Sequence, residues 1–256
     1  MIVVRLEGLA AALLATVLLA GCAGMERQVG EDQAEAAEIN AELGIGYLRE
    51  GEFEQAERNL RRALDYDPNH PLAHLGMGAV YERRGALGRA EEHYRKALDA
   101  DPDNPHVQTS LGALLCAREE HDDAQALFLR AIDNPDYDQR EIALMNSGVC
   151  FADVGDAARA EEQLRAALEL RPRYPRALLE MATLSYAEGR PMQTRAFLSR
   201  LETQGFENAE MLLLCYQSEM ALGNRGAARE CAQRLRQNYP DSREFARLER
   251  LEHEGG

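Results

Sequence analysis

Residues 71–104 read PLAHLGMGAVYERRGALGRAEEHYRKALDADPDN and contain the signals for two short helices that face each other. Small residues at Gly78 and Ala90 suit the point where such helices cross, because larger side chains would push the axes beyond the usual ~8–10 Å. Gly85 interrupts the helical period between them and marks a turn. Pro71 fits a first helical position, where its missing N–H costs no hydrogen bond. The segment therefore predicts a helical hairpin.

The same pattern recurs along the chain at a nearly constant period. It predicts repeat units at residues 37–70, 71–104, 105–140, 141–174, 175–208 and 209–241, followed by a C-terminal helix. The small position of the first helix carries Gly44, Gly78, Gly112, Gly148, Ala182 and then Tyr216. The turn carries Gly51, Gly85, Glu119, Gly155, Gly189 and Gly223. The pattern resembles the tetratricopeptide repeat, with four good copies followed by two degenerate ones. That resemblance implies an all-α, right-handed superhelical solenoid of about six tetratricopeptide helix pairs over residues 34–256.

The charge composition argues against one class of partner. The chain has 44 acidic and 29 basic residues, which gives a formal net charge of −15. Because nucleic-acid binding requires a basic face that neutralises phosphates, we expect no nucleic-acid partner. The acidity indicates a solvated surface or, alternatively, attraction to a basic segment of a partner.

The first 21 residues have the pattern of a secretory signal. Arg5 precedes an apolar run from Leu9 to Ala20 that is too short to span a bilayer as a helix. We therefore expect residues 1–21 to be a signal peptide outside the folded domain.

The end of that signal resembles the bacterial lipobox, since Leu19-Ala20-Gly21 precedes Cys22. The resemblance implies cleavage before Cys22 and lipidation of its thiol, which makes residues 22–33 a lipidated tether. Ala23 stands where an aspartate would retain the protein at the inner membrane, so we expect a lipid anchor on the periplasmic face of the outer membrane. The alternative is an ordinary cleaved signal with a coincidental cysteine.

Four further cysteines fall into two pairs. Cys116 and Cys150 lie one repeat apart on neighbouring first helices, where the Cα separation a disulfide needs is attainable. Cys215 and Cys231 lie on the two antiparallel helices of the last unit and could meet across the hairpin. An oxidising compartment favours both bridges, the second less surely. The alternative is four small buried thiols.

Signals for catalysis are missing from the sequence. The histidines are scattered, the cysteine spacings are not zinc signatures, and we find no glycine-rich phosphate loop, nucleophile elbow or His/carboxylate constellation. We therefore expect a binding protein rather than an enzyme, without catalytic residues, metal, cofactor or small-molecule substrate.

The first helices of tetratricopeptide arrays line a concave groove, and this resemblance assigns the groove to apolar positions. They are Ala41, Ile45, Leu48, Leu72, Leu75, Ala79, Ala113, Met145, Val149, Leu179 and Tyr186. An apolar lining would take an amphipathic helix or an extended apolar segment of a partner. The alternative is that these side chains mainly pack between first helices or under the amino-terminal segment.

A more specific resemblance rests on the junction of the third and fourth units. The stretch Asp133-Asn134-Pro135-Asp136-Tyr137 carries a two-residue insertion relative to the repeat, and Asn146-Ser147-Gly148-Val149-Cys150 follows it. Together with Leu114-Leu115-Cys116, the lipobox and the six-repeat length, these features resemble the type IV pilus biogenesis lipoproteins called PilW or PilF.

The PilW/PilF resemblance implies a pilotin, an outer-membrane lipoprotein that binds subunits of the pilus secretin and promotes their localisation and multimer assembly. By that resemblance Cys22 is the lipid site, and Cys116 and Cys150 fall where some members carry cysteines. The competing hypothesis is a general periplasmic scaffold, for example one that organises cell-wall enzymes.

Overall fold

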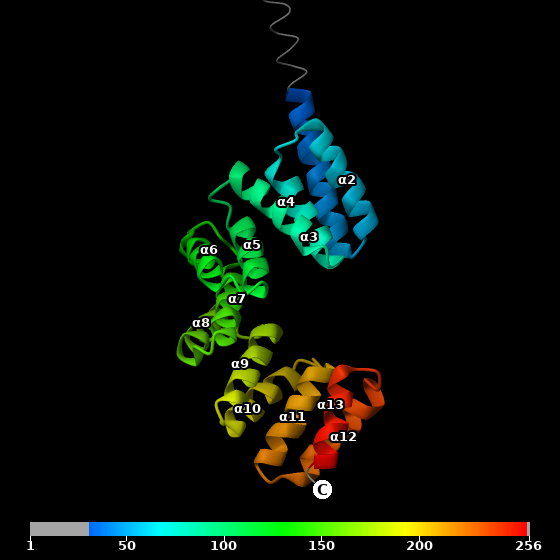
Figure 1. The fold of residues 1–256 in the computed structure, drawn as a ribbon, viewed down its shortest axis with the longest axis vertical. Helices are drawn as coiled ribbons and strands as arrows, with labels where there is room; N and C mark the ends of the chain where they lie inside the picture. The colour runs from blue at the N-terminus through cyan, green and yellow to red at the C-terminus, as the bar shows by residue number, and fades with distance from the viewer. Residues whose placement is uncertain (1–30, 255–256) are drawn as a thin grey trace, which may run out of the picture. The chain divides into compact units, whose positions relative to one another are not determined.

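The computed structural model describes residues 31–254, and the regular elements among them are all helices (Figure 1). The first helix covers residues 31–50. The others are α2 (Phe53–Tyr66), α3 (Pro71–Arg83), α4 (Leu87–Ala100), α5 (Pro105–Ala117), α6 (His121–Asp133), α7 (Arg140–Asp153), α8 (Ala157–Leu170), α9 (Pro175–Ala187), α10 (Pro191–Glu202), α11 (Ala209–Ala221), α12 (Arg225–Asn238) and α13 (Arg243–Glu254). Six helix pairs and a final helix match the predicted units, so the all-α repeat fold is confirmed.

The amino-terminal boundary differs from the prediction. The chain is already helical at residue 31, so residues 31–33, which we assigned to the tether, belong to the first helix. The alanines and glutamates that follow are strong helix formers and extend it in this direction. The predicted signal peptide and Cys22 lie outside the described residues.

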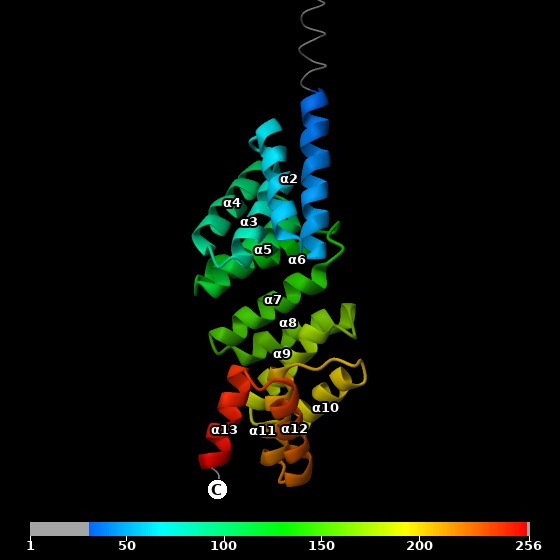
Figure 2. The ribbon, with the colours of Figure 1, turned by 90° about the vertical axis from the view of Figure 1, so that its right-hand side faces the viewer.

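The described part of the chain divides into two compact units between Val107 and Gln108, in the first turn of α5. Within each unit, a helix packs against its neighbours along the chain, as tetratricopeptide helices do. In the second unit, α9 to α12 follow one another side by side (Figure 2).

The small residues of the first helices lie where each pair crosses. A Cβ on Gly44 would lie 2.5 Å from Leu60 Cγ of α2, and one on Gly148 would lie 2.8 Å from Leu164 Cγ of α8. At Gly78 of α3, a Cβ would fall inside the space of the buried Tyr94 ring of α4. Only a residue without a Cβ allows these helices to approach so closely.

The turns between paired helices repeat one backbone conformation. The predicted turn positions all have positive φ, at Gly51, Gly85, Glu119, Gly155, Gly189 and Gly223. Glu119, with φ 66°, is the one non-glycine residue of the described chain in this region. The period of the repeat therefore dictates the left-handed turn even where glycine is absent.

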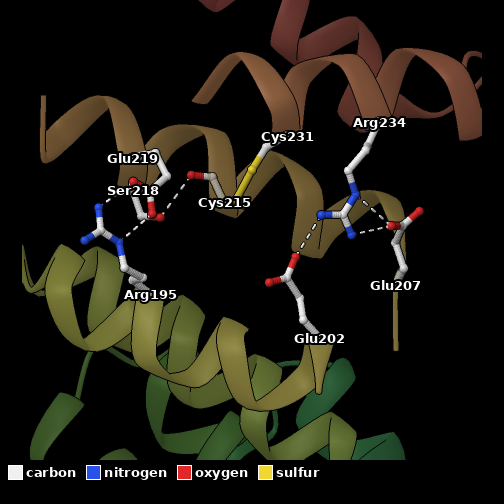
Figure 3. Close-up of a disulfide and its surroundings, with 8 residues drawn as sticks. All are labelled: Arg195, Glu202, Glu207, Cys215, Ser218, Glu219, Cys231 and Arg234. Carbon is white, nitrogen blue, oxygen red and sulfur yellow. Dashed lines mark hydrogen bonds and ion pairs between the residues drawn. A yellow bond between two sulfur atoms is a disulfide. The ribbon is translucent and has the colours of Figure 1, made fainter. Parts of the chain in front are cut away.

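The last pair uses other interactions in place of the small residue at the crossing. Tyr216 occupies that position on α11, and both Tyr216 and Ala232 of α12 belong to one buried cluster. Cys215 and Cys231 are bonded to each other across the same hairpin (Figure 3). The last repeat is thus held by a disulfide. It carries the large residue on its first helix and the small one on its second, which is the reverse of the earlier pairs.

Ion pairs join this hairpin to α10 and to the loop that follows α10 (Figure 3). Arg195 of α10 donates two hydrogen bonds to Glu219 of α11, at 2.6 Å and 2.5 Å, and the Glu219 residue is only 5% exposed. Arg234 of α12 donates to Glu202 at 2.8 Å and to Glu207 at 3.0 Å and 2.5 Å. Removing one partner of such a partly buried pair leaves the other charge without compensation.

Among the described residues, none of the helices combines the length and the apolar character needed to cross a membrane.

The crossing at Gly78 can be tested against a matched glycine. We expect Gly78→Ala to destabilise the protein by about 1–3 kcal/mol, because the new methyl group must displace the Tyr94 ring. Gly88→Ala, at an exposed position of α4 with nothing within 4 Å of an added Cβ, should be neutral or stabilise by about 0.5–1 kcal/mol. Urea denaturation of both variants measures the difference, and equal effects would contradict the packing.

Candidate functional site

The apolar residues assigned to the groove fall into two sets, one in each compact unit. The first set comprises Ala41, which is fully buried, and Ile45, Leu48, Leu72, Leu75 and Ala79, which are half-buried. Ile45 points toward α3, since its Cδ1 lies 3.0 Å from where a Cβ of Gly76 would be. Ile45 therefore packs toward α3, and all five half-buried residues leave part of their surface open.

The second set is less open than expected. Val149 of α7 is half-buried, but Met145 is 4% exposed and belongs to the core of α7, α8 and α9. We assigned Met145 to the partner-binding groove, and that assignment is wrong, because the side chain packs between helices and offers almost no surface. Leu179 is buried in the same core.

Sequence reasoning missed the most exposed apolar face of the first unit. Ile39 and Leu43, which are 48% and 49% exposed, lie one turn apart on the helix over residues 31–50. Together with Gly46 and Tyr47 they line a shallow depression, and Glu42 and Glu50 also border it. We refer to Ile39, Leu43, Gly46 and Tyr47 as the amino-terminal apolar face.

The opposite side of this helix is firmly packed. Ala37 and Ala41 are fully buried, and Gly44 lies against Leu60 of α2. The apolar face is therefore displayed by a helix that has little freedom to rotate.

The second unit has a cavity of a different character. Its volume is about 540 Å³, and it lies between residues of α9, α11 and α13. Tyr186, Leu213 and Leu214 supply apolar surface. Three arginines of α13 and two carboxylates also line it, at Arg243, Arg247, Arg250, Glu210 and Glu244. The cavity therefore contains a local excess of positive charge in an acidic chain, and the repeat pattern alone did not point to it.

The cysteines lie in the two pairs that the sequence favours. Cys116 of α5 is bonded to Cys150 of α7 with a Cα separation of 5.8 Å, and Cys215 of α11 to Cys231 of α12 with a separation of 6.0 Å. The first bridge joins neighbouring repeats, whereas the second closes one hairpin. His121 lies beside the first bridge, with its Nδ1 3.4 Å from Cys150 Sγ.

Comparison with known proteins places this geometry in a family. Tetratricopeptide repeat models match residues 41–105, 83–144 and 215–242. The type IV pilus assembly protein PilF of Pseudomonas aeruginosa is 30% identical over 216 residues, covering 84% of this chain and 85% of that protein. This chain belongs to the PilF/PilW family.

Solved structures agree with this membership. The crystal structure of PilW, a widely conserved type IV pilus biogenesis factor, has a TM-score of 0.76 and 29% identity, covering 83% of this chain and 97% of that chain. The structure of PilF from Pseudomonas aeruginosa has a TM-score of 0.74 and 30% identity, covering 86% and 99%. The resemblance to the PilF/PilW family predicted from the sequence is therefore confirmed.

Two histidines in the first unit form a contact that depends on their charge state. The Nδ1 atoms of His74 in α3 and His93 in α4 lie 2.9 Å apart, so at least one ring must be neutral to accept a hydrogen bond. Burial, followed by the neighbouring His74 and Lys96, lowers the pKa of His93 to about 4. Burial also lowers the pKa of His74. His70, four residues before His74, bonds Glu38 at 3.0 Å and caps α3.

This contact predicts a loss of stability in acid. Because the folded pKa of His93 is about 4 and the unfolded value is about 6.5, protonation between those values favours the unfolded chain. The contribution of His93 to the free energy of unfolding should be fully present above about pH 6.5. It should fall by about 1–3 kcal/mol as the pH approaches 4. Urea denaturation at several pH values measures it.

The variant His93→Gln isolates this contribution from that of the carboxylates. The free-energy difference between wild type and His93→Gln should shrink as the pH falls from 7 to about 4, whereas the difference for exposed His253→Gln should not change. A constant difference for His93→Gln would show that this ring does not carry the effect.

Proposed function

We propose that this protein is an outer-membrane lipoprotein that binds subunits of the type IV pilus secretin and promotes their localisation and multimer assembly. Its membership of the family of the type IV pilus assembly protein PilF supports a role in pilus assembly. The observation that carries the binding step is the amino-terminal apolar face.

That face has the properties of a docking surface. Ile39 and Leu43 are each about half exposed, although both are large aliphatic side chains on a well-packed helix. Contiguous exposed apolar surface commonly marks a protein interaction site. The apolar side of a partner helix or an extended apolar segment would bury it. The half-buried Leu48 and Leu75 of the predicted groove offer further apolar surface in the same unit.

Rigidity adds to the affinity of such a surface. The buried Ala37 and Ala41 and the close contact of Gly44 with Leu60 hold the helix in place. A partner that docks on a preorganised helix loses less conformational freedom than one that must order a mobile segment.

The proposed lipid on Cys22 determines where the face acts. Acyl chains contribute about 0.8 kcal/mol per buried CH₂, so several chains give an effectively permanent anchor. The chain between Cys22 and the helix at residue 31 reaches at most about 30 Å. The apolar face would then work close to the membrane, where captured subunits have a raised effective concentration for ring assembly. In this proposal the protein binds and positions subunits and performs no catalysis.

Charged substitutions test the apolar face. We expect Ile39→Glu and Leu43→Glu to weaken binding of the purified secretin by about tenfold or more, since a buried carboxylate would lose its hydration in the complex. Met192→Glu, at a side chain 61% exposed in the second unit, is the matched control and should bind normally. Surface plasmon resonance measures the affinities and circular dichroism the fold. Normal binding by folded Ile39→Glu and Leu43→Glu would exclude this face.

The role of the anchor is tested in cells. Deletion of the gene should abolish heat-resistant secretin multimers, and Cys22→Ala should misplace the secretin while leaving its binding intact. Gel electrophoresis without boiling and membrane fractionation measure both effects, with the exposed Met192→Glu as a control outside the anchor. Unchanged outer-membrane multimers in the deletion strain would rule out the pilotin function and favour the general periplasmic scaffold.

A further inference from the structure

Three helices bring together a set of metal-ligating atoms around the first disulfide. Cys116 lies near the end of α5, His121 begins α6 and Cys150 lies in α7. His121 Nδ1 is 3.4 Å from Cys150 Sγ and 3.9 Å from Cys116 Sγ, and the three ligand atoms all lie within 4.8 Å of one another. Asp153 adds a carboxylate oxygen 3.8 Å from Cys116 Sγ.

The turn after α5 explains why His121 returns to Cys116. Glu119 adopts the left-handed conformation, with φ 66°, and its N–H donates to the Cys116 carbonyl at 2.9 Å. The Glu120 N–H donates to the Leu115 carbonyl at 2.9 Å. This closed turn carries the first residue of α6 back over the end of α5. The sequence spacing of Cys116 and His121 showed no zinc signature because the turn, not a short motif, creates the proximity.

The donor set and its dimensions suit one class of ion. Two thiolates and an imidazole are ligands of tetrahedral Zn²⁺, with Zn–S about 2.3 Å and Zn–N about 2.0–2.1 Å. Those bond lengths place neighbouring ligand atoms about 3.5–3.8 Å apart at tetrahedral angles. The two nitrogen-to-sulfur distances, 3.4 Å and 3.9 Å, bracket this range, so the ligands need only small shifts once the sulfurs separate.

We propose that the reduced form of this protein binds one Zn²⁺-class ion through Cys116, His121 and Cys150. Asp153 or a water molecule supplies the fourth ligand. The disulfide and the metal are alternative states, because each uses both sulfur atoms. A dithiol reductant supplies two electrons and two protons, which break the S–S bond and give two thiols, while the dithiol becomes a disulfide. Metal binding then releases the two thiol protons to water.

The residues around the site are compatible with both the disulfide and the metal-bound form. Gln125 of α6 donates to the Ser147 carbonyl of α7 at 3.0 Å and accepts from the Ser147 hydroxyl at 2.7 Å. These bonds hold α6 against α7 independently of the disulfide. Cys116 and Cys150 are buried, but His121 is half-buried and Asp153 is exposed, so an ion can enter from their side. The structure thus provides a supported site with an entry path.

Cobalt provides a direct test. The full chain carrying Cys22→Ser, Cys215→Ser and Cys231→Ser retains only the two thiols of the site. After reduction with a phosphine and removal of the reductant under inert gas, Co²⁺ should bind at one ion per chain. The expected signals are an intense near-ultraviolet thiolate-to-cobalt charge-transfer band and the visible bands of tetrahedral cobalt, both of which Zn²⁺ should remove. The oxidised protein should give neither band.

Matched variants assign the ligands. His121→Gln keeps both thiols and should weaken Co²⁺ binding by about tenfold or more and alter the visible bands, whereas exposed His253→Gln should have no effect. A reduced, folded protein without the charge-transfer band, or unchanged binding by His121→Gln, would overturn the proposal. If reduction alone unfolds the second unit, Zn²⁺ must restore its circular dichroism, and failure to do so would equally overturn it.

Discussion

The approach of two helices at a residue without a Cβ is the constraint on which the repeats depend. Gly78 and Gly112 each face a buried aromatic ring, of Tyr94 and Phe128, at distances that no larger residue permits. The ring fills the volume that the glycine leaves, so the pair of residues sets the separation of the helices. The left-handed turn follows, because the chain must reverse within a few residues to present the second helix at that separation.

Where this pairing weakens toward the end of the chain, other forces replace it. The fifth and sixth pairs use the Arg195–Glu219 ion pair and the Cys215–Cys231 bridge (Figure 3). A buried ion pair adds little net stability over apolar packing, but it strongly disfavours arrangements that separate the charges. The bridge restricts the unfolded chain instead of improving contacts in the folded one. The degenerate repeats therefore keep the repeat geometry by specific cross-links.

The sequence predicted the features that depend on the repeat period. It missed those that depend on which helices cover a given helix face. The six helix pairs, the turn at Glu119 and the pairing of the cysteines follow from residues at fixed offsets. Periodicity shows which side of a helix is apolar, but not whether another helix covers it. Met145 was therefore assigned to an open groove although it is buried, and the exposed face at Ile39 went unnoticed. The cluster at His121 arises from a turn whose course no motif encodes.

The amino-terminal apolar face and the Cys116–Cys150 site belong to different compact units. The stability of a repeat array is approximately a sum of terms from each repeat and its immediate neighbours. A cross-link between α5 and α7, whether a disulfide or a metal ion, therefore acts first on the third and fourth pairs. The proposed partner capture and the proposed exchange of the disulfide for a metal ion therefore concern different repeats of this chain.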